Sequence, residues 1–159
     1  MGRGTSCLSW VAEKGWSRMG VERVVELPAT MFAEAVQLWH ETGLTRPWND
    51  PDADLRRAMR GPASTVLFAQ DAAAALLGTA MVGHDGHRGW VYYLAVQPAL
   101  QGRGLGRLLM SACETWLRDR DIPKVQLMVR QDNAAALGFY PALGYELMEV
   151  AVWGRRLDR

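Results

Sequence analysis

Cysteine is scarce in this chain. Its 159 residues include 2 cysteines, Cys7 and Cys113. This allows at most one disulfide and excludes a zinc site built from CxxC pairs. Cys113 falls in an apolar helical pattern, so we expect a buried thiol there. A chain of this length can bury a core without help from a metal or a disulfide, and we expect no metal site.

An excess of charge of one sign and long apolar runs are also missing. The 18 basic and 17 acidic side chains leave a net charge of +1, without the basic excess that nucleic-acid binding needs. The longest weakly polar run, Ala72–Gly83, is too short to span a membrane. The chain start lacks the pattern of a secretory signal. We therefore expect a cytoplasmic protein with no nucleic-acid or membrane partner.

The first residues lack a sustained apolar period. Several glycines are mixed there with Trp10 and Trp16. We expect a poorly ordered extension over residues 1–18, followed by a single domain over residues 19–159. A helical arm that docks through the two tryptophans is the alternative.

From Val21 onward, apolar periodicity and breaker residues predict alternating strands and helices. β-Branched or alternating runs predict strands over residues 21–27, 65–69, 76–82, 90–96 and 125–129, and one bent strand or two over 145–153. Helical stripes and caps predict helices that begin near Phe32, Pro51, Leu105 and Ala134. This order indicates an α/β fold, a largely antiparallel sheet with one parallel crossover after Val96.

A glycine-rich turn stands before the strongest helical stripe. Alternating glycines in Gln101–Arg107 let backbone N–H groups converge, and the helix that follows adds its own free N–H groups and positive dipole end. Arg103 and Arg107 can add charge, which predicts a phosphate site. Arg107 stands where a dinucleotide motif needs glycine, and no nucleotide P-loop is present. A plain glycine turn remains the alternative.

Two blocks of residues resemble a known family. Leu94-Ala95-Val96-x-Pro98 followed by Gln101-x-x-Gly104-x-Gly106 is similar to the acyl-CoA signature of the GCN5-related N-acetyltransferases, the GNAT superfamily. Asn133-x-x-Ala136-x-x-Phe139-Tyr140, continuing to Leu143-Gly144-Tyr145, is similar to its second block. Residues 46–51, 85–89 and 92–94 also resemble a small bacterial subgroup exemplified by YpeA.

The resemblance implies a GNAT-like twisted sheet flanked by about four helices, with a splayed strand pair that holds acyl-CoA. It implies transfer of an acetyl group from acetyl-CoA, without a metal, to a primary amine of a small molecule, peptide or protein. The implied cofactor-binding residues are Leu94, Ala95, Val96, Gln101, Gly102, Arg103, Gly104, Leu105, Gly106, Arg107, Asn133, Ala136 and Phe139. The N–H near Leu94 or Ala95 matches the family's oxyanion donor.

The implied acid is Tyr140, which matches the family's tyrosine that protonates the leaving thiolate. The alternative is that Tyr140 is a buried aromatic residue with no role in catalysis. Pro141 disfavours helical geometry at Tyr140, so the hydroxyl could be displaced. Trp90 stands where many members carry a carboxylate base, and Tyr92 on the same side of the strand could hold a water that carries the proton away. Asp50, expected to cap a helix, and the surface-turn residues His84, Asp85 and His87 are further candidates, so the base stays unassigned.

The loop over residues 42–50 is expected to set acceptor specificity, because this loop does so in the family. The candidate acceptor-binding residues are Arg46, Trp48, Asn49 and Trp90. Trp48 could equally anchor the loop. Exposed apolar residues near the C-terminus, such as Val150, Val152 and Trp153, could serve a homodimer or belong to the core. An acyl-CoA-binding regulatory module with little turnover, or an N-acetylating toxin acting on aminoacyl-tRNA, is the alternative function.

Overall fold

The computed structural model describes residues 10–11 and 20–158. The chain divides into two compact units, Met1–Leu127 and Met128–Arg159, and each is described by itself. Of the predicted extension over residues 1–18, only Trp10–Val11 is described, as strand β1. The rest lies outside the described residues, so the extension and the domain over 19–159 stay predictions.

The first unit is built on one sheet of six strands in the order β1-β2-β3-β4-β5-β6. Neighbouring strands are antiparallel except β5 and β6, which are parallel. The strands after β1 are β2 (Arg23–Glu26), β3 (Ser64–Gln70), β4 (Leu76–His84), β5 (Gly89–Val96) and β6 (Val125–Gln126). This confirms the mixed, largely antiparallel sheet with its parallel crossover after Val96.

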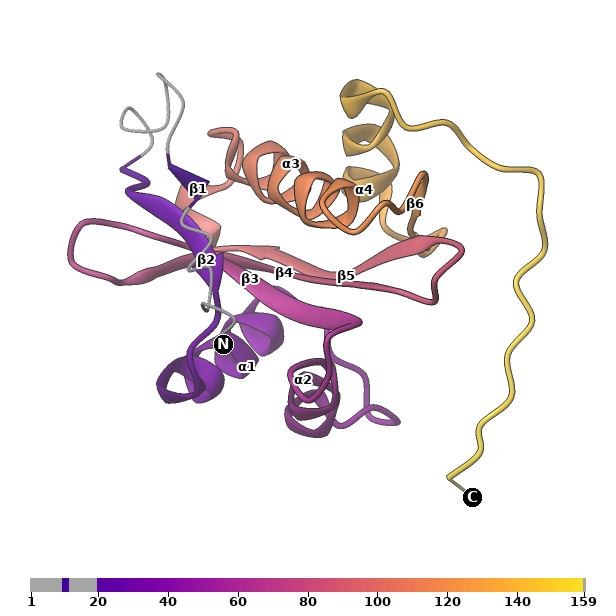
Figure 1. Cartoon of the computed structure of the whole chain (residues 1–159), viewed down its shortest axis with the longest axis horizontal. Helices are drawn as coiled ribbons and strands as arrows, with labels where there is room; N and C mark the ends of the chain where they lie inside the picture. Colours follow the sequence, from indigo (N-terminus) through magenta and orange to yellow (C-terminus); the bar gives the residue numbers. More distant parts are fainter. Residues whose placement is uncertain (1–9, 12–19, 159) are drawn as a thin grey trace, which may run out of the picture. The chain divides into compact units, whose positions relative to one another are not determined.

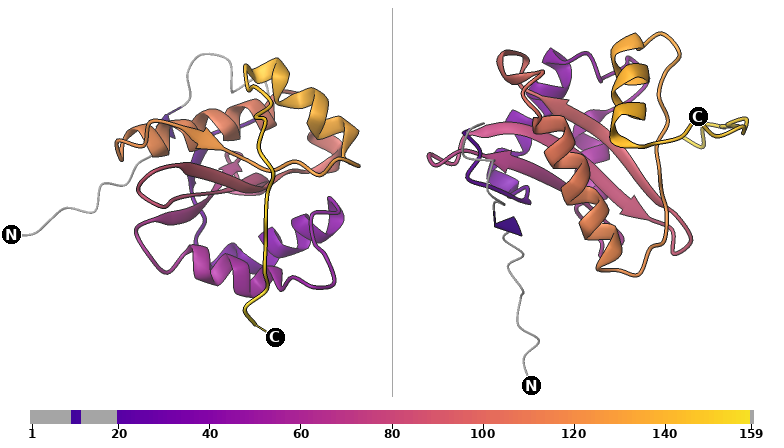
Figure 2. Two further views of the ribbon diagram at one scale, coloured as in Figure 1. Left: turned by 90° about the vertical axis from the view of Figure 1, so that its right-hand side faces the viewer. Right: turned by 90° about the horizontal axis from the view of Figure 1, so that it is seen from above.

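Helices cover both faces of the sheet. Helices α1 (Phe32–Glu41) and α2 (Pro51–Ala58) lie on one face and α3 (Leu105–Arg118) crosses the other (Figures 1 and 2). The start of α2 is fixed locally, as predicted, because the Asp50 carboxylate accepts from the Ala53 N–H at 3.0 Å and Pro51 follows it. Short 3-10 turns precede α1 (η2, Ala29–Met31) and follow β5 (η3, Pro98–Leu100).

The main core lies between α1, α2 and the sheet. Trp39 and Leu55 project from the helices and Val66 and Phe68 from β3, and all four are buried. On the opposite face, α3 buries a full stripe that includes Trp116 and the free thiol of Cys113, which is 0% exposed. The buried thiol at Cys113 is therefore confirmed.

A β-bulge interrupts the pairing of β4 with β5. Thr79 is opposite Ala95 and Met81 is opposite Tyr92, so the two residues between Tyr92 and Ala95 lie opposite a single residue of β4. Tyr93 at this bulge has a φ of 49°, in the left-handed region that side chains other than glycine rarely adopt. The bulge reverses the alternation of β5, so Tyr92 and Tyr93 both line the cavity described below.

The second unit contains helix α4 (Ala134–Phe139) followed by the 3-10 turn η4 (Pro141–Leu143). The expected helix over 134–143 is thus divided, because Pro141 has no N–H for a helical bond. Tyr140 nevertheless keeps helical angles (φ −68°, ψ −40°), against the expectation for a residue before proline. The strand expected over 145–153 was wrong, because residues 145–158 contain no helix or strand. The strand expected over 125–129 is reduced to β6.

Candidate functional site

The glycine-rich turn ends directly at the N-terminus of α3. Gly102 and Gly104 have φ values of 75° and 95°, and Gly104 is the residue that caps the helix. These left-handed angles explain why glycine stands at both positions. The Gln101 side-chain amide donates to the Val96 carbonyl at 3.2 Å and so ties the turn to the end of β5. No helical carbonyl precedes the first N–H groups of α3, an arrangement that favours anions at this end of the helix.

Most of the β5 edge beyond Trp90 has no strand partner among the described residues. Its pairing with β6 consists of Gly89 opposite Val125 and Trp90 opposite Gln126. From Val91 to Val96, no strand among the described residues pairs with this side of β5. Backbone N–H and C=O groups on such an edge can pair with an extended ligand, as in the addition of a strand to a sheet.

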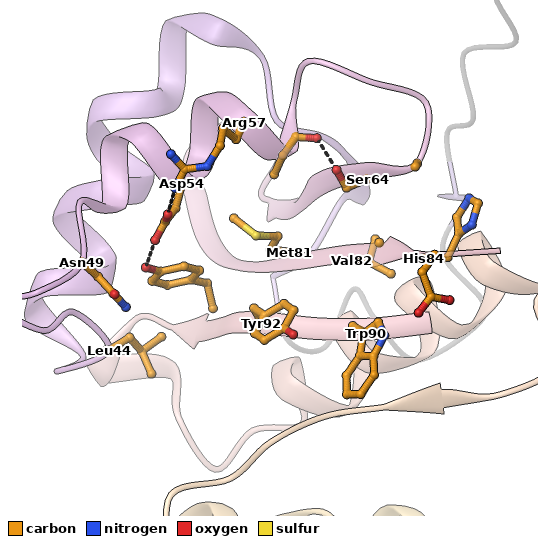
Figure 3. Close-up of a pocket in the computed structure, with 15 residues that line it drawn as sticks. Leu44, Asn49, Asp54, Arg57, Ser64, Met81, Val82, His84, Trp90 and Tyr92 are labelled. Atoms are coloured by element: carbon orange, nitrogen blue, oxygen red, sulfur yellow. Dashed lines mark hydrogen bonds and ion pairs between the residues drawn. The ribbon is translucent and has the colours of Figure 1, made fainter. Parts of the chain in front are cut away.

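A cavity of about 690 Å³ lies over the face of the sheet that carries α1 and α2 (Figure 3). Asn49 and Asp54 lie at one end, His84 at the other, and Tyr92 and Trp90 follow each other along β5 between them (Figure 3). The cavity wall consists of Leu44, Asn49, Asp54, Arg57, Ala58, Ala63, Ser64, Met81, Val82, Gly83, His84, Asp85, Trp90, Tyr92 and Tyr93.

At the α2 end of the cavity, Asp54 joins two partners. One carboxylate oxygen accepts from the Tyr93 hydroxyl at 2.8 Å and the other forms an ion pair with Arg57. Burial, reinforced by the Asp54 charge, raises the pKa of the Tyr93 hydroxyl well above its ordinary value. Tyr93 is therefore a fixed hydrogen-bond donor rather than a base.

At the opposite end, Asp85 belongs to the turn between β4 and β5. Its carboxylate accepts from the Arg88 N–H at 2.7 Å and from the His87 N–H at 2.8 Å. These two backbone bonds, helped by the Trp90 side chain, hold the pKa of the Asp85 carboxyl below its ordinary value. Asp85 is thus ionised at neutral pH.

Two successive hydrogen bonds connect the bulge in β5 to helix α1. The buried Trp39 indole N–H donates to the Thr79 hydroxyl at 2.8 Å, and that hydroxyl donates to the Tyr93 carbonyl at 3.3 Å. The Tyr93 ring stacks on Trp39, with centroids 4.0 Å apart. Tyr93 is thus fixed through its carbonyl, its ring and its hydroxyl, which explains how its unusual backbone angle is maintained.

The family model described as the acetyltransferase (GNAT) family matches residues 33–145. Acetyltransferase YE1169 of Yersinia enterocolitica is 42% identical over 126 residues, which cover 79% of this chain and 89% of that protein. This chain belongs to the GNAT family. The finer resemblance to the YpeA-like subgroup stays a prediction.

Solved structures agree with this chain in fold. The aminoglycoside acetyltransferase AAC(6')-Iy, in complex with the bisubstrate analogue CoA-S-monomethyl-acetylneamine, has a TM-score of 0.70 at 17% identity, covering 84% of this chain and 96% of its own. A mutant of the BH1408 protein from Bacillus halodurans has a TM-score of 0.67 at 20% identity, covering 84% and 99%. The GNAT-like α/β fold with four helices is therefore confirmed.

The GNAT chain brings some of the predicted acceptor residues together and leaves others apart. Asn49, Trp90 and Tyr92 line the cavity. Arg46 and Trp48 are not among its lining residues. The Arg46 guanidinium donates to the carbonyl oxygens of two residues of its own loop, and the Trp48 side chain is 55% exposed.

The candidates for the base are also divided. Asp50 caps α2, as expected, and lies outside the cavity lining. Of the surface-turn candidates, His84 and Asp85 line the cavity, whereas His87 does not. Burial raises the pKa of Tyr92, so its neutral form dominates at physiological pH.

Sequence reasoning missed Asp54, Arg57 and Tyr93, which build the α2 end of the cavity. The signal that could have found the first two is their place on the first and second turns of a helix whose start was predicted. Nothing local indicates that Tyr93 faces the same way as Tyr92, because the bulge reverses the alternation.

The second predicted block lies in the second unit of the GNAT chain. The Asn133 side chain accepts from the Ala136 N–H at 3.1 Å and caps α4. The Tyr140 ring meets Phe139 and Tyr145 edge to face, with centroids 5.0 and 5.8 Å away. Within its unit, the Tyr140 ring therefore packs against two other aromatic rings.

Two further expectations concern metals and membranes. Among the described residues, no three acidic, histidine or cysteine side chains are grouped so that they could hold a metal ion. Over the same residues, no helix is long and apolar enough to cross a bilayer.

Proposed function

We propose that this acetyltransferase moves an acetyl group from acetyl-CoA to a primary amine of a small molecule or peptide, by direct attack of the amine on the thioester. The observation that carries the proposal is the continuous path from the open edge of β5, through the bulge at Tyr93, to the glycine turn and the N-terminus of α3. The proposed ligand residues are Leu94, Ala95, Val96, Gln101, Gly102, Arg103, Gly104, Leu105, Gly106 and Arg107.

The turn residues fit a pyrophosphate. A Cβ added at Gly102 would meet no heavy atom within 4 Å, so the space above this backbone is open to a ligand. The N–H groups of the turn and of the first turn of α3 would donate to phosphate oxygens, and the dipole of the helix favours negative charge. Arg103 and Arg107 add positive charge to the same segment.

The open edge of β5 fits the extended pantetheine arm, whose amides can pair with the backbone of Leu94 and Val96. When bound, acetyl-CoA supplies an activated acyl group with a thiolate leaving group. The Leu94 or Ala95 N–H would stabilise the negative charge that develops on the carbonyl oxygen. This role is favoured by the bulge, because Tyr93 is fixed immediately before these two N–H groups.

The amine acceptor would enter from the cavity, where Asn49, Trp90 and Tyr92 form part of the wall. Two structures of similar fold are aminoglycoside acetyltransferases: AAC(6')-Iy, bound to CoA-S-monomethyl-acetylneamine, and meta-AAC0020, bound to sisomicin. Tyr140 remains the proposed acid for the leaving thiolate, with Asn133, Ala136 and Phe139 as further cofactor-binding residues, on the motif alone. A homodimer and a cytoplasmic location stay predictions.

Thermal unfolding with and without acetyl-CoA tests the proposal first. Ligand at a hundred times its dissociation constant stabilises by about 2.7 kcal/mol. For a chain of this size we expect the midpoint to rise by about 5–11 °C. NADH and ATP are the controls and should give no rise of this size. No shift at millimolar acetyl-CoA would contradict the proposal, whereas a rise leads to measuring CoA release with amines.

A further inference from the structure

One end of the cavity carries the Asp85 carboxylate, which forms no ion pair with any described residue, and this end lies away from the proposed acyl site. We propose that the acceptor carries a second cationic group, held by Asp85 and the Trp90 ring while its other end presents the reacting amine beside Leu94. The acceptor class is then a dicationic amine with an apolar spacer, such as a long-chain α,ω-diamine. This inference rests on the proposed function, because the position of the reacting amine beside Leu94 comes from that proposal.

The two ends of the cavity differ in charge balance. At the α2 end, Asp54 is paired with Arg57, so the two charges cancel. Among the described residues, no cationic side chain lies within ion-pair distance of Asp85. The Arg88 guanidinium instead donates to the His87 carbonyl at 3.0 Å. Asp85 is exposed to solvent, and a ligand cation in the cavity would find an unpaired carboxylate at this end.

Trp90 adds a second reason to expect a cation there. Its side chain lines the same cavity as Asp85 and helps to lower the pKa of that carboxyl. An indole face attracts ammonium groups, most strongly of all aromatic rings, so a carboxylate beside an indole forms a combined cation site. His84 also lines this end, and its Nδ1 accepts from the Gly86 N–H at 3.2 Å.

The distance along β5 determines how long the acceptor must be. Leu94 lies four residue steps after Trp90, which at about 3.3 Å per step gives roughly 13 Å, slightly less across the bulge. A single ammonium cannot occupy both ends of such a span. The cation at Asp85 is therefore not the amine that reacts.

The wall between the two ends selects the chemistry of the spacer. Met81 and Val82 line it from β4, opposite Tyr92 and Val91 in the register of the strands, and Tyr92 lines it from β5 (Figure 3). Methylene groups pack favourably on these side chains, whereas hydroxyl groups placed there would lose their hydrogen bonds to water. A terminal carboxylate would be repelled by Asp85. A polyhydroxylated amine or an ω-amino acid thus fits less well than a diamine.

Initial rates of CoA release would test this inference on the full-length protein. The substrates are the α,ω-diamines from propane to decane, with the monoamine and the ω-amino acid of each length as controls. We expect the longer diamines to exceed both controls by about tenfold in kcat/KM, chiefly through KM, with the preference falling as salt rises. Equal kcat/KM for a long diamine and its monoamine would overturn the proposal.

Asp85→Asn tests the residue itself. The asparagine oxygen can still accept from the His87 and Arg88 N–H groups, so the turn is preserved while the charge is lost. We expect the ratio of diamine to monoamine kcat/KM to fall toward one. Glu34→Gln is the matched control, since Glu34 is an exposed carboxylate on α1 outside the cavity, and it should keep the wild-type ratio. An unchanged ratio in Asp85→Asn would overturn the proposal.

Thermal shift separates this inference from the proposed function. If acetyl-CoA stabilises the protein and monoamines or amino acids react as well as diamines, the inference is wrong and the acetyltransferase proposal stands. If acetyl-CoA stabilises the protein and no amine of the series reacts, the diamine class is likewise wrong. If acetyl-CoA gives no shift and no CoA is released, the proposed function fails, and this inference fails with it.

Discussion

Trp39 and Tyr93 lie stacked, 4.0 Å between ring centroids, and are joined a second time through Thr79, which accepts from one and donates to the other. A helix and a bulged strand are thus linked by both a ring contact and a buried hydrogen-bonded chain. The link lies next to Leu94, where the proposed oxyanion donor lies. It joins the stability of the first unit to the geometry of its proposed chemistry.

Thr79→Val should therefore affect both stability and turnover. Valine keeps the shape of threonine but leaves the buried Trp39 N–H without an acceptor, which costs about 1–3 kcal/mol of unfolding free energy, measured by urea denaturation. We also expect kcat to fall, because the Tyr93 carbonyl loses its anchor. Thr65→Val is the control, since among the described residues the Thr65 hydroxyl donates to the Met59 sulfur, at 3.6 Å, and not to an oxygen or nitrogen. Equal losses of unfolding free energy in the two variants would argue against a special role for the hydrogen bonds from Trp39 through Thr79 to Tyr93.

Gly104→Val should abolish the stabilisation by acetyl-CoA. A β-branched residue at a φ of 95° is strained, and its side chain would also cover the N–H groups that begin α3. Gly43→Val is the matched control, because Gly43 has a φ of 70° with nothing within 4 Å of an added Cβ and follows α1. It should lower the melting temperature but keep the ligand-induced rise. Retained affinity in Gly104→Val would contradict the phosphate site.

Gly89→Ala should destabilise the first unit, because α3 packs closely on the start of β5. An added Cβ would lie 2.4 Å from Leu117 Cδ1, so the side chain or the helix must move. We expect a loss of about 1–3 kcal/mol in chemical denaturation. Combining it with Leu117→Ala should give a smaller loss than the sum of the two single changes. Strict additivity would show that this contact does not limit the packing.

Tyr140→Phe tests the proposed acid. Removing the hydroxyl should lower product formation by about tenfold or more, because a positioned proton donor typically contributes about 100-fold to 10,000-fold. The acetyl-CoA-induced thermal shift should be retained, because the ring stays. Tyr145→Phe, which removes the hydroxyl of a ring that packs against Tyr140, is the control and should react at the wild-type rate. An unchanged rate for Tyr140→Phe would exclude it as the acid.

Cys113 should be unreactive in the folded protein. Burial raises the pKa of its thiol well above the ordinary value, so almost no thiolate forms at neutral pH. In a Cys7→Ser background, a disulfide reagent should label the protein only after urea unfolds it. Rapid labelling of the native protein would show that α3 opens locally under native conditions.

The sequence was sufficient where the structure is determined locally. Asp50 and Pro51 predict the start of α2, and the apolar stripe from Leu105 predicts α3, because capping and periodicity depend on neighbours in the chain. The sequence was not sufficient where the structure depends on pairing with a distant segment. The apolar residues over 145–153 predict a strand, but a strand forms only when another backbone pairs with it, and a local pattern does not contain that information.

The candidate site shows the same division. The glycine turn could be recognised because positive φ values at Gly102 and Gly104 require a specific residue. The cavity could not, because Tyr93 reaches it through a bulge whose position depends on the register with β4. Asp85 was seen as part of a turn, and only the fold brings that turn beside Trp90 and the cavity.

The edge of β5 that lacks a strand partner among the described residues also affects how readily the purified protein aggregates. From Val91 to Val96 it offers another chain a ready template for intermolecular β-pairing, and no charged side chain in this stretch opposes such pairing. A ligand on that edge would occupy the same hydrogen-bonding groups. Purification and storage with coenzyme A should therefore suppress aggregation, even at concentrations where the gain in melting temperature is small.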